Sequence, residues 1–258
     1  MKMEYCAISD KGLVREKNED NLLMLPDANV FVVADGMGGH KGGEIASKLT
    51  VDTIRDYYRG MVNTNNKTSG IESLKESLGV LTKGEAQLWQ AIEKANTAVY
   101  EVGLVLDPAR GVGTTIVAGY VHGKTLYVLY SGDSRLYRIR KGRMKQITED
   151  HSLLNQYLKE KKITLREAEF FPYRNVIMQA LGLSPNCNAE SRRTKIQPGD
   201  TYIFCTDGLT DMVNDKEIHT LIDTPGPLDD KCRALVDAAL ANGGMDNITV
   251  LLLRFSED

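Results

Sequence analysis

The stretch Val30-Phe31-Val32-Val33-Ala34-Asp35-Gly36 joins an apolar run of strand length to an aspartate and a glycine. Such a run predicts a buried strand, and the carboxylate after it is expected at the rim of a sheet. Three other apolar runs have an aspartate near one end: 126–130 before Asp133, 202–206 before Asp207, and 248–253 after Asp246. Four such junctions predict carboxylates gathered at one end of a sheet, the environment that a hard metal ion requires.

Length and composition favour a single soluble domain. The chain has 258 residues, 42% of them hydrophobic, and no Pro/Ser/Gly-rich linker divides it, so one domain over residues 1–258 is expected. The formal net charge of -3 gives no reason to expect nucleic acid or a membrane surface as a partner. No apolar stretch reaches the ~20 residues of a membrane span, and the start lacks a signal peptide's apolar segment. We therefore expect a cytoplasmic protein.

The order of predicted elements favours an α+β fold. Helical periodicity is expected over 43–58, 88–102, 152–171 and 228–241, and strands over 5–9, 21–26, 30–34, 114–121, 125–130, 135–140, 143–147, 200–205 and 248–254. The connections between consecutive strands are too short for crossover helices, so the pairing is expected to be antiparallel. Helices that come separately from such strands favour two sheets packed face to face with helices outside.

The type of candidate ligand narrows the chemistry. All the acids are oxygen donors, and no His or Cys stands at metal-like spacing, which favours Mg²⁺ or Mn²⁺ over zinc. Two such ions ~3.5–4 Å apart can share a bridging water in line with a phosphorus atom. Asp35 is suited to span both ions, and Gly36 is expected to form a tight turn that exposes a carbonyl. Arg15 can grip phosphate oxygens in a bidentate way. The sequence therefore predicts a phosphate-ester hydrolase.

Six segments in order resemble the successive motifs of bacterial protein phosphatase 2C-like enzymes, the metal-dependent serine/threonine phosphatases: GLVREKNED, VVADGMGGHKGGE, GTT, SGDSRLYR, TDGLTD and DNITV. The similarity runs from about residue 4 to residue 254. The resemblance implies a four-layer α-β-β-α sandwich of two mostly antiparallel sheets flanked by helices. It also implies hydrolysis of phosphoserine and phosphothreonine by direct attack of a metal-bridging water.

The resemblance further implies a metal-ligand set at one end of the sandwich. Asp35 would bridge two Mn²⁺ or Mg²⁺ ions, and the Gly36 carbonyl would bind one of them. Asp207 and Asp246 would complete the ligand set of the other ion. Asp133, in the GDSR segment, matches a residue that with Asp207 forms a third, weaker metal site in bacterial members.

Further residues would support this set. Arg15 would hold the substrate phosphate, Glu19 and Asp20 would act through metal-bound water or support the ligands, and Asn247 would support them as well. Residues 152–175 look like the mobile flap beside the active site, a subdomain thought to shape the selection of protein substrates.

The leaving group needs a proton, and the sequence offers two candidate donors. Animal members carry a His after the Asp-Gly pair, whereas this chain has Met37, so metal-bound water is the expected donor and His40 a second candidate. His151 is expected to be structural or to anchor the flap. Asp211 and Asp215 are expected to be charges at a helix start.

Three alternatives stay open. One is a binding module that keeps the fold without catalysis, although degenerate relatives lose acids and none is missing here. A phosphatase dedicated to one anti-σ-factor-type partner and a phosphomonoesterase acting on small molecules are the others. The expected partners are phosphorylated proteins, by family analogy including a serine/threonine kinase and its substrates, and the chain is expected to be a monomer.

Overall fold

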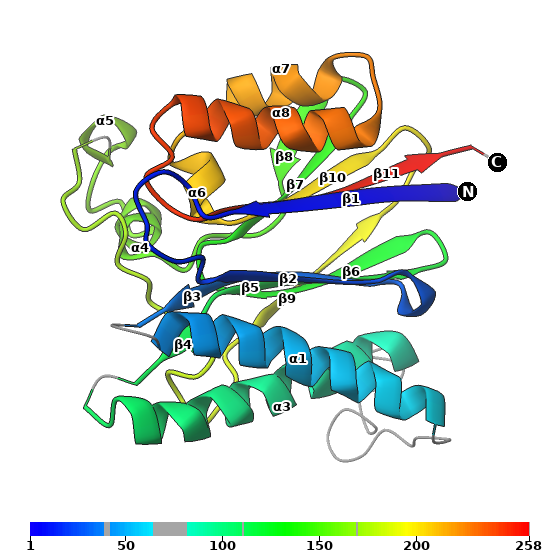
Figure 1. Ribbon diagram of the computed structural model, residues 1–258. Coiled ribbons are helices and arrows are strands. Elements are labelled where there is room, and N and C mark those ends of the chain that lie inside the picture. Colours follow the sequence, from blue (N-terminus) through cyan, green and yellow to red (C-terminus); the bar gives the residue numbers. More distant parts are fainter. Residues whose placement is uncertain (39–41, 64–81, 110, 169, 258) are drawn as a thin grey trace.

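The computed structural model describes residues 1–38, 42–63, 82–109, 111–168 and 170–257. Two antiparallel sheets pack face to face in the middle, and helices cover the outer face of each (Figure 1). The four-layer α+β sandwich expected from the sequence is confirmed. None of the described helices combines the length and the apolar character needed to cross a membrane.

The first sheet has five strands in the order β1-β11-β10-β7-β8. These are β1 (Lys2–Asp10), β11 (Ile248–Ser256), β10 (Thr201–Cys205), β7 (Arg135–Arg140) and β8 (Arg143–Gln146). The two ends of the chain are neighbours in this sheet, since β1 pairs with β11 from Lys2–Ser256 to Asp10–Ile248. The segment after β1 therefore starts beside the segment that leads into β11.

The second sheet has six strands, in the order β2-β3-β5-β6-β9 with β4 paired to β3. They are β2 (Asp20–Leu25), β3 (Val30–Met37), β4 (Gly113–Thr114), β5 (Ile116–His122), β6 (Thr125–Ser131) and β9 (Glu190–Lys195), and the 3-10 turn η1 (Pro26–Ala28) joins β2 to β3. The expectation that the strand stops before Asp35 was wrong. β3 continues to Met37, and Gly36 pairs with Thr114 of β4 instead of forming a turn.

Helices form the two outer layers and one end of the molecule. α1 (Gly42–Asn63) and α3 (Lys83–Leu106) cover the second sheet, while α7 (Asp215–Asp223) and α8 (Leu228–Ala241) cover the first (Figure 1). The single turn α6 (Asp207–Thr210) follows β10. The helix expected over 152–171 is instead two short helices, α4 (Leu153–Lys159) and α5 (Leu165–Ala168), which lie beside one end of the sandwich.

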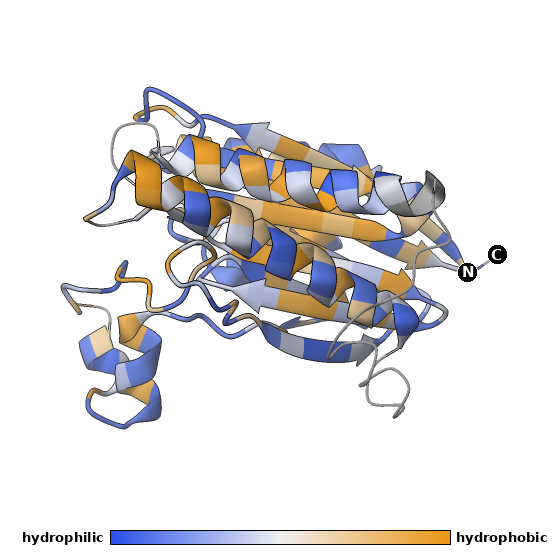
Figure 2. Ribbon diagram, turned by 90° about the horizontal axis from the view of Figure 1, so that it is seen from below, coloured by the Kyte–Doolittle hydropathy of each residue, from blue (hydrophilic) through white to orange (hydrophobic). Residues whose placement is uncertain are grey.

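Three apolar layers hold the four structural layers together. Phe31, Tyr130 and Phe204 lie among the buried side chains between the sheets. Ile54 of α1 and Leu88 of α3 belong to the cluster against the second sheet. Figure 2 shows this arrangement from below, with hydrophobic strands behind two helices of mixed hydropathy. Because these layers fix the strand ends, the acidic segments at one end of the sandwich are placed by the core.

Candidate active site

Asp20 and Asp35 lie directly opposite each other on β2 and β3. Loss of bulk water raises the pKa of Asp20 to about 7, and the charges of Asp207 and Asp246 add to the effect. The pKa of Asp35 is raised well above its ordinary value by the same loss of solvent, followed by the charge of Asp20 and then of Asp207 and Asp133. The strand register alone thus brings two of the predicted acids together.

Asp207 joins this pair from the other sheet. It is the first residue of α6, and its interaction with the Asp35 side chain favours the ionised form of Asp207. Desolvation raises the pKa of Asp207 to about 6, followed by the charges of Asp211 and Asp246. The expectation that Asp211 is a helix-start charge was wrong, because Asp211 follows the last residue of α6.

Asp133 lies in the short connection between β6 and β7. Its pKa is raised to about 7, first by desolvation and then by the charges of Asp207 and Asp150. The turn before it is fixed by the buried imidazole of His151, whose Nδ1 accepts a hydrogen bond from the Gly132 N–H at 3.2 Å. His151 thus has the structural contact that was expected of it.

Three of these carboxylates have a buried oxygen without a hydrogen-bond partner: Oδ1 of Asp20, Asp133 and Asp207. Buried acceptors are normally satisfied, so unsatisfied carboxylate oxygens at one end of the sandwich indicate a site for a cation. Across the described ranges, however, no three His, Cys, Asp or Glu side chains stand at the spacing of a metal centre. The oxygen donors therefore suit a hard cation in their chemistry rather than in their spacing.

Arg15 contacts this cluster from its solvent side. Its Nη2 donates to Asp246 Oδ2 at 2.6 Å, and both side chains are partly exposed. The pKa of Arg15 is raised, chiefly by this hydrogen bond, against the opposing cost of desolvation, and the charges of Glu19 and Asp35 contribute as well. A partly exposed guanidinium that is bound to a partly exposed carboxylate can exchange it for another oxyanion.

The loop that carries Arg15 is held by the buried side chain of Asn247. Its Oδ1 accepts from the Glu19 N–H at 2.8 Å, and its Nδ2 donates to the carbonyls of Lys11 and Lys17 at 2.9 and 2.8 Å. All the polar atoms of this amide are therefore used on one segment, 11–19. The side chain of Asn247 thus positions Glu19 and the loop that carries Arg15, and its backbone N–H donates to Asp246 Oδ1 at 2.8 Å.

Threonine hydroxyl groups position the acids from behind, a role that no sequence pattern had indicated. Asp20 Oδ2 accepts from Thr249 Oγ1 at 2.7 Å and from Thr206 Oγ1 at 2.9 Å, which links the two sheets at the site. The Asp35 N–H donates to Thr115 Oγ1 at 3.0 Å, and the Asp35 carbonyl accepts from Thr114 Oγ1 at 2.8 Å. The GTT segment therefore fixes the backbone of Asp35.

Gly36 and Gly43 allow two backbones to approach closely. A Cβ on Gly36 would lie 2.1 Å from the Gly43 carbonyl oxygen, and one on Gly43 would lie 2.7 Å from the Gly36 carbonyl oxygen and 2.8 Å from Glu19 Oε2. The pKa of Glu19 is raised, mainly by desolvation and then by the charges of Glu44 and Asp246, against the opposing charge of Arg15. The glycine pair thus places the Gly36 carbonyl and Glu19 beside the start of α1.

A cavity of about 70 Å³ lies among these acids. It is lined by Asp133, Asp207 and Asp211 together with Arg174 and Asn175. Of the residues singled out from sequence, the structure gathers these nine at one end of the sandwich: Arg15, Glu19, Asp20, Asp35, Gly36, Asp133, Asp207, Asp246 and Asn247. His40 lies outside the described residues.

Comparisons with known proteins give a consistent result. The family model described as protein phosphatase 2C matches residues 14–246. The chain is 31% identical to the serine/threonine phosphatase stp of Listeria innocua over 95% of this chain and 93% of that protein. Its fold is similar to the serine/threonine phosphatase PstP/Ppp of Mycobacterium tuberculosis, with a TM-score of 0.82, 32% identity and 99% of each chain covered.

A second solved structure is a complex with a metal. The PstP catalytic domain in complex with two manganese ions has a TM-score of 0.80 and 31% identity, with 99% of each chain covered. The family model and the relatives span nearly the whole of this sequence, including every segment that supplies an acid. The chain belongs to the protein phosphatase 2C family.

Proposed function

We propose that this protein is a metal-dependent phosphatase that removes phosphate from phosphoserine and phosphothreonine in proteins. One observation carries the proposal: acids from both sheets converge on Asp35, and several have raised pKa values and unsatisfied oxygens. Repulsion between carboxylates this close together costs free energy unless a bound cation offsets it. Membership in the protein phosphatase 2C family supports the same conclusion.

The oxygen donors present suit Mn²⁺ or Mg²⁺ in their chemistry. Asp35, Asp207 and Asp246 would hold two ions with the Gly36 carbonyl, and Asp133 would contribute with Asp207 to a third. When bound, the ions supply a water of lowered pKa for direct attack on phosphorus and neutralise charge on the phosphoryl oxygens.

The chain's own residues orient the substrate. Arg15 would bind two phosphate oxygens through its planar fork after leaving Asp246, and the exposure of both groups makes this exchange accessible. Asn247 would keep Arg15 and Glu19 in register with the acids through its three bonds to segment 11–19. Asp20 would hold Asp35 in place across the β2–β3 pair.

The chain as one catalytic domain with a flap over 152–175 is also part of the proposal. Its support is the way the two ends of this segment are tied: Ser152 and Ile177 form a bridge, and the Met178 N–H donates to the His151 carbonyl at 2.7 Å. Arg174 and Asn175 reach the cavity beside Asp133. The flap would therefore contact the substrate protein around its phosphorylated residue.

The proposed partners follow from this chemistry. Phosphoserine and phosphothreonine arise by phosphoryl transfer, so a serine/threonine kinase would supply the substrates and is itself a candidate substrate when phosphorylated. The protein would act as a monomer in the cytoplasm, where such phosphoproteins are made.

Hydrolysis of a phosphothreonine peptide and of p-nitrophenyl phosphate tests the proposal. We expect turnover of both with Mn²⁺ and loss of turnover in excess chelator. Turnover that persists in chelator would contradict metal dependence. Turnover of small phosphate monoesters alone, with no phosphopeptide or phosphoprotein hydrolysed, would favour a phosphomonoesterase acting on small molecules.

A further inference from the structure

Beside the candidate active site, one side of the sandwich is lined by cations. β8 and β9 are edge strands of their sheets. They lie on the same side of the sandwich, as a hydrogen bond between the sheets shows: Arg138 of β7, the strand next to β8, donates to the Thr194 hydroxyl of β9 at 3.2 Å. We name this surface the β8–β9 side and define it by Arg138, Arg143, Lys145 and Arg192.

Strand register places these cations on the face between the sheets. Lys145 is opposite Arg138, and Arg143 is opposite Arg140. Leu136, two residues before Arg138, belongs to the core between the sheets, so alternation along β7 turns Arg138 and Arg140 to the same side. Arg192 is opposite Val128, another member of that core. Cations from three strands therefore share one opening.

The charges on the β8–β9 side are only partly compensated. Arg140 is paired with the buried Asp200, and Arg192 contacts Glu190 and Glu149 at 3.0 and 3.7 Å. The Nε of Arg138 is buried without a hydrogen-bond partner. Arg143 and Lys145 are exposed, and neither has an ion-pair partner within the described part of the chain. An excess of positive charge is left at this opening.

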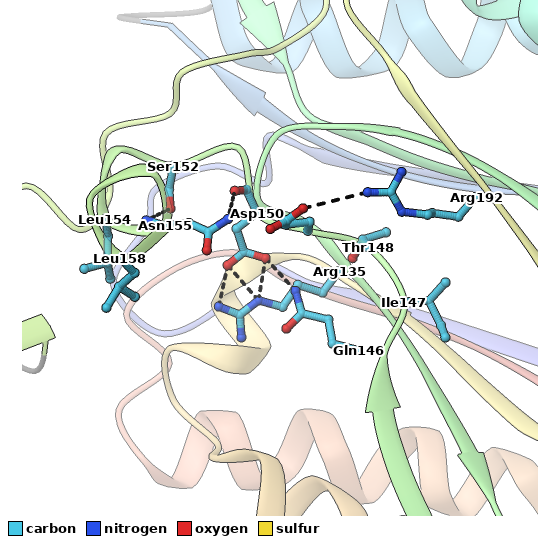
Figure 3. Close-up of a pocket in the computed structure, with 11 residues that line it drawn as sticks. Arg135, Gln146, Ile147, Thr148, Asp150, Ser152, Leu154, Asn155, Leu158 and Arg192 are labelled. Carbon is cyan, nitrogen blue, oxygen red and sulfur yellow. Dashed lines mark hydrogen bonds and ion pairs between the residues drawn. The ribbon is translucent and has the colours of Figure 1, made fainter. Parts of the chain in front are cut away.

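A cavity of about 480 Å³ lies between Arg192 of the β8–β9 side and the Arg135–Asp150 pair (Figure 3). Gln146, which follows Lys145, lines it together with Arg192, Ile147 and Leu158. Its lining shares four residues with the smaller cavity among the acids: Arg135, Asp150, Ser152 and Leu154.

The shared wall is rigid. Arg135 Nε donates to both oxygens of Asp150 at 3.0 Å, and its Nη2 donates to Oδ2 at 2.7 Å, as the dashed lines in Figure 3 show. A bidentate pair of this kind fixes both side chains. A substrate polypeptide bound at the acids can thus continue into the larger cavity along a preformed surface.

We propose that the β8–β9 side binds an acidic segment of the phosphoprotein substrate, adjacent to the phosphorylated residue. The proposal rests on the proposed function, since it needs the phosphate to occupy the acid cluster. Charge complementarity selects an acidic occupant, and continuity of the two cavities sets its position next to the phosphate. The apolar side chains of Ile147, Leu154 and Leu158 provide contact surface for the intervening residues.

The test compares two phosphothreonine peptides of equal length, one with acidic and one with neutral flanks, and p-nitrophenyl phosphate. We expect the wild-type protein to favour the acidic peptide by about five- to tenfold in kcat/KM, mainly through KM, and the preference to shrink as salt rises. The double variant Arg143→Glu, Lys145→Glu should lose the preference. Its kcat/KM for p-nitrophenyl phosphate should stay within about twofold of wild type, because the small substrate does not reach the β8–β9 side.

A matched variant controls for net charge. Lys94→Glu, Arg233→Glu makes the same change in charge at exposed positions on α3 and α8, and it should keep the preference for the acidic peptide.

Equal rates for both peptides in the wild type, or a preference that survives in the Arg143, Lys145 variant, would overturn the inference while leaving the proposed function intact. Loss of all three activities in the wild type would count against the proposed function instead. A short oligonucleotide that binds wild type but not the variant, without any peptide preference, would overturn it in favour of a nucleic-acid surface.

Discussion

The side-chain carbonyl of Asn247 accepts a hydrogen bond from the backbone N–H of Glu19, at 2.8 Å and across 228 positions of sequence. The same amide donates to the carbonyls of Lys11 and Lys17. One buried side chain, from the residue just before β11, thus holds the loop after β1. Because Arg15 is on that loop, the geometry of the proposed phosphate contact depends on Asn247.

Replacing Asn247 with alanine should therefore affect both stability and substrate binding. Three hydrogen bonds are lost, at ~0.5–1.5 kcal/mol each, so we expect a decrease of about 2–4 kcal/mol in the free energy of unfolding. The KM for a phosphopeptide should rise because Arg15 is no longer held. Asn242→Ala, which removes one exposed bond to the Met212 carbonyl, should change both by much less. Denaturant titration and steady-state kinetics give the two readouts, and equal effects of the two variants would contradict the role of Asn247.

Much of the fold could be predicted because it follows from local periodicity. α8 has the bounds 228–241 that its apolar spacing indicated, and the strand runs around Val30 and Ile248 were found. β9 was missed, because its sequence Glu190–Lys195 has no apolar alternation. As an edge strand it pairs on one side only and is largely exposed, so charged residues are tolerated there.

The acids of the site could be predicted for a similar reason. A carboxylate directly beside an apolar run stands out from its neighbours, as Asp35 and Asp207 do. Thr206 and Thr249 do not stand out, because a threonine in a strand is unremarkable until the partner of its hydroxyl group is known. Their partner is Asp20, in the other sheet, so only the packing of the two sheets reveals the role.

Replacing the acids one at a time should distinguish the proposed ligands of the two main ions from the ligand of the third ion by the loss of kcat/KM. Asp35→Ala and Asp207→Ala should each lower kcat/KM by at least about 1000-fold, equivalent to ~4 kcal/mol, because the cations lose a shared ligand. Asp133→Ala should lower it by about tenfold, since only the weaker third position is affected. Titration calorimetry with Mn²⁺ checks ligand loss independently of activity. Asp56→Ala, at an exposed position of α1, is the control, and an Asp35→Ala variant with an unchanged rate would refute the assignment.

The raised pKa of Asp20 predicts the pH dependence of stability. The folded protein keeps a proton on this carboxyl up to about pH 7, whereas the unfolded chain releases it near pH 3.8, so without divalent cations stability falls as pH rises through that window. Asp20→Asn removes this contribution and keeps an acceptor for the two threonines. We expect the variant to gain about 1–4 kcal/mol relative to wild type between pH 4.5 and pH 7.5 in chelator. Asp27→Asn, at an exposed position of η1, should show no such trend, and a difference between Asp20→Asn and wild type that stays constant with pH would contradict the assignment.

Two glycines of α1 should respond in opposite ways to alanine. A Cβ at Gly43 would lie 2.7 Å from the Gly36 carbonyl oxygen and 2.8 Å from Glu19 Oε2, whereas one at Gly60 meets nothing within 4 Å. Gly60→Ala should therefore stabilise the protein by ~0.5–1 kcal/mol through helix propensity alone. Gly43→Ala gains the same propensity but pushes α1 away from β3, so it should destabilise the protein and weaken Mn²⁺ binding by displacing the Gly36 carbonyl. Calorimetric melting and Mn²⁺ titration of both variants measure this, and the same stabilisation in both would show that the approach of Gly36 to Gly43 is not needed for the site.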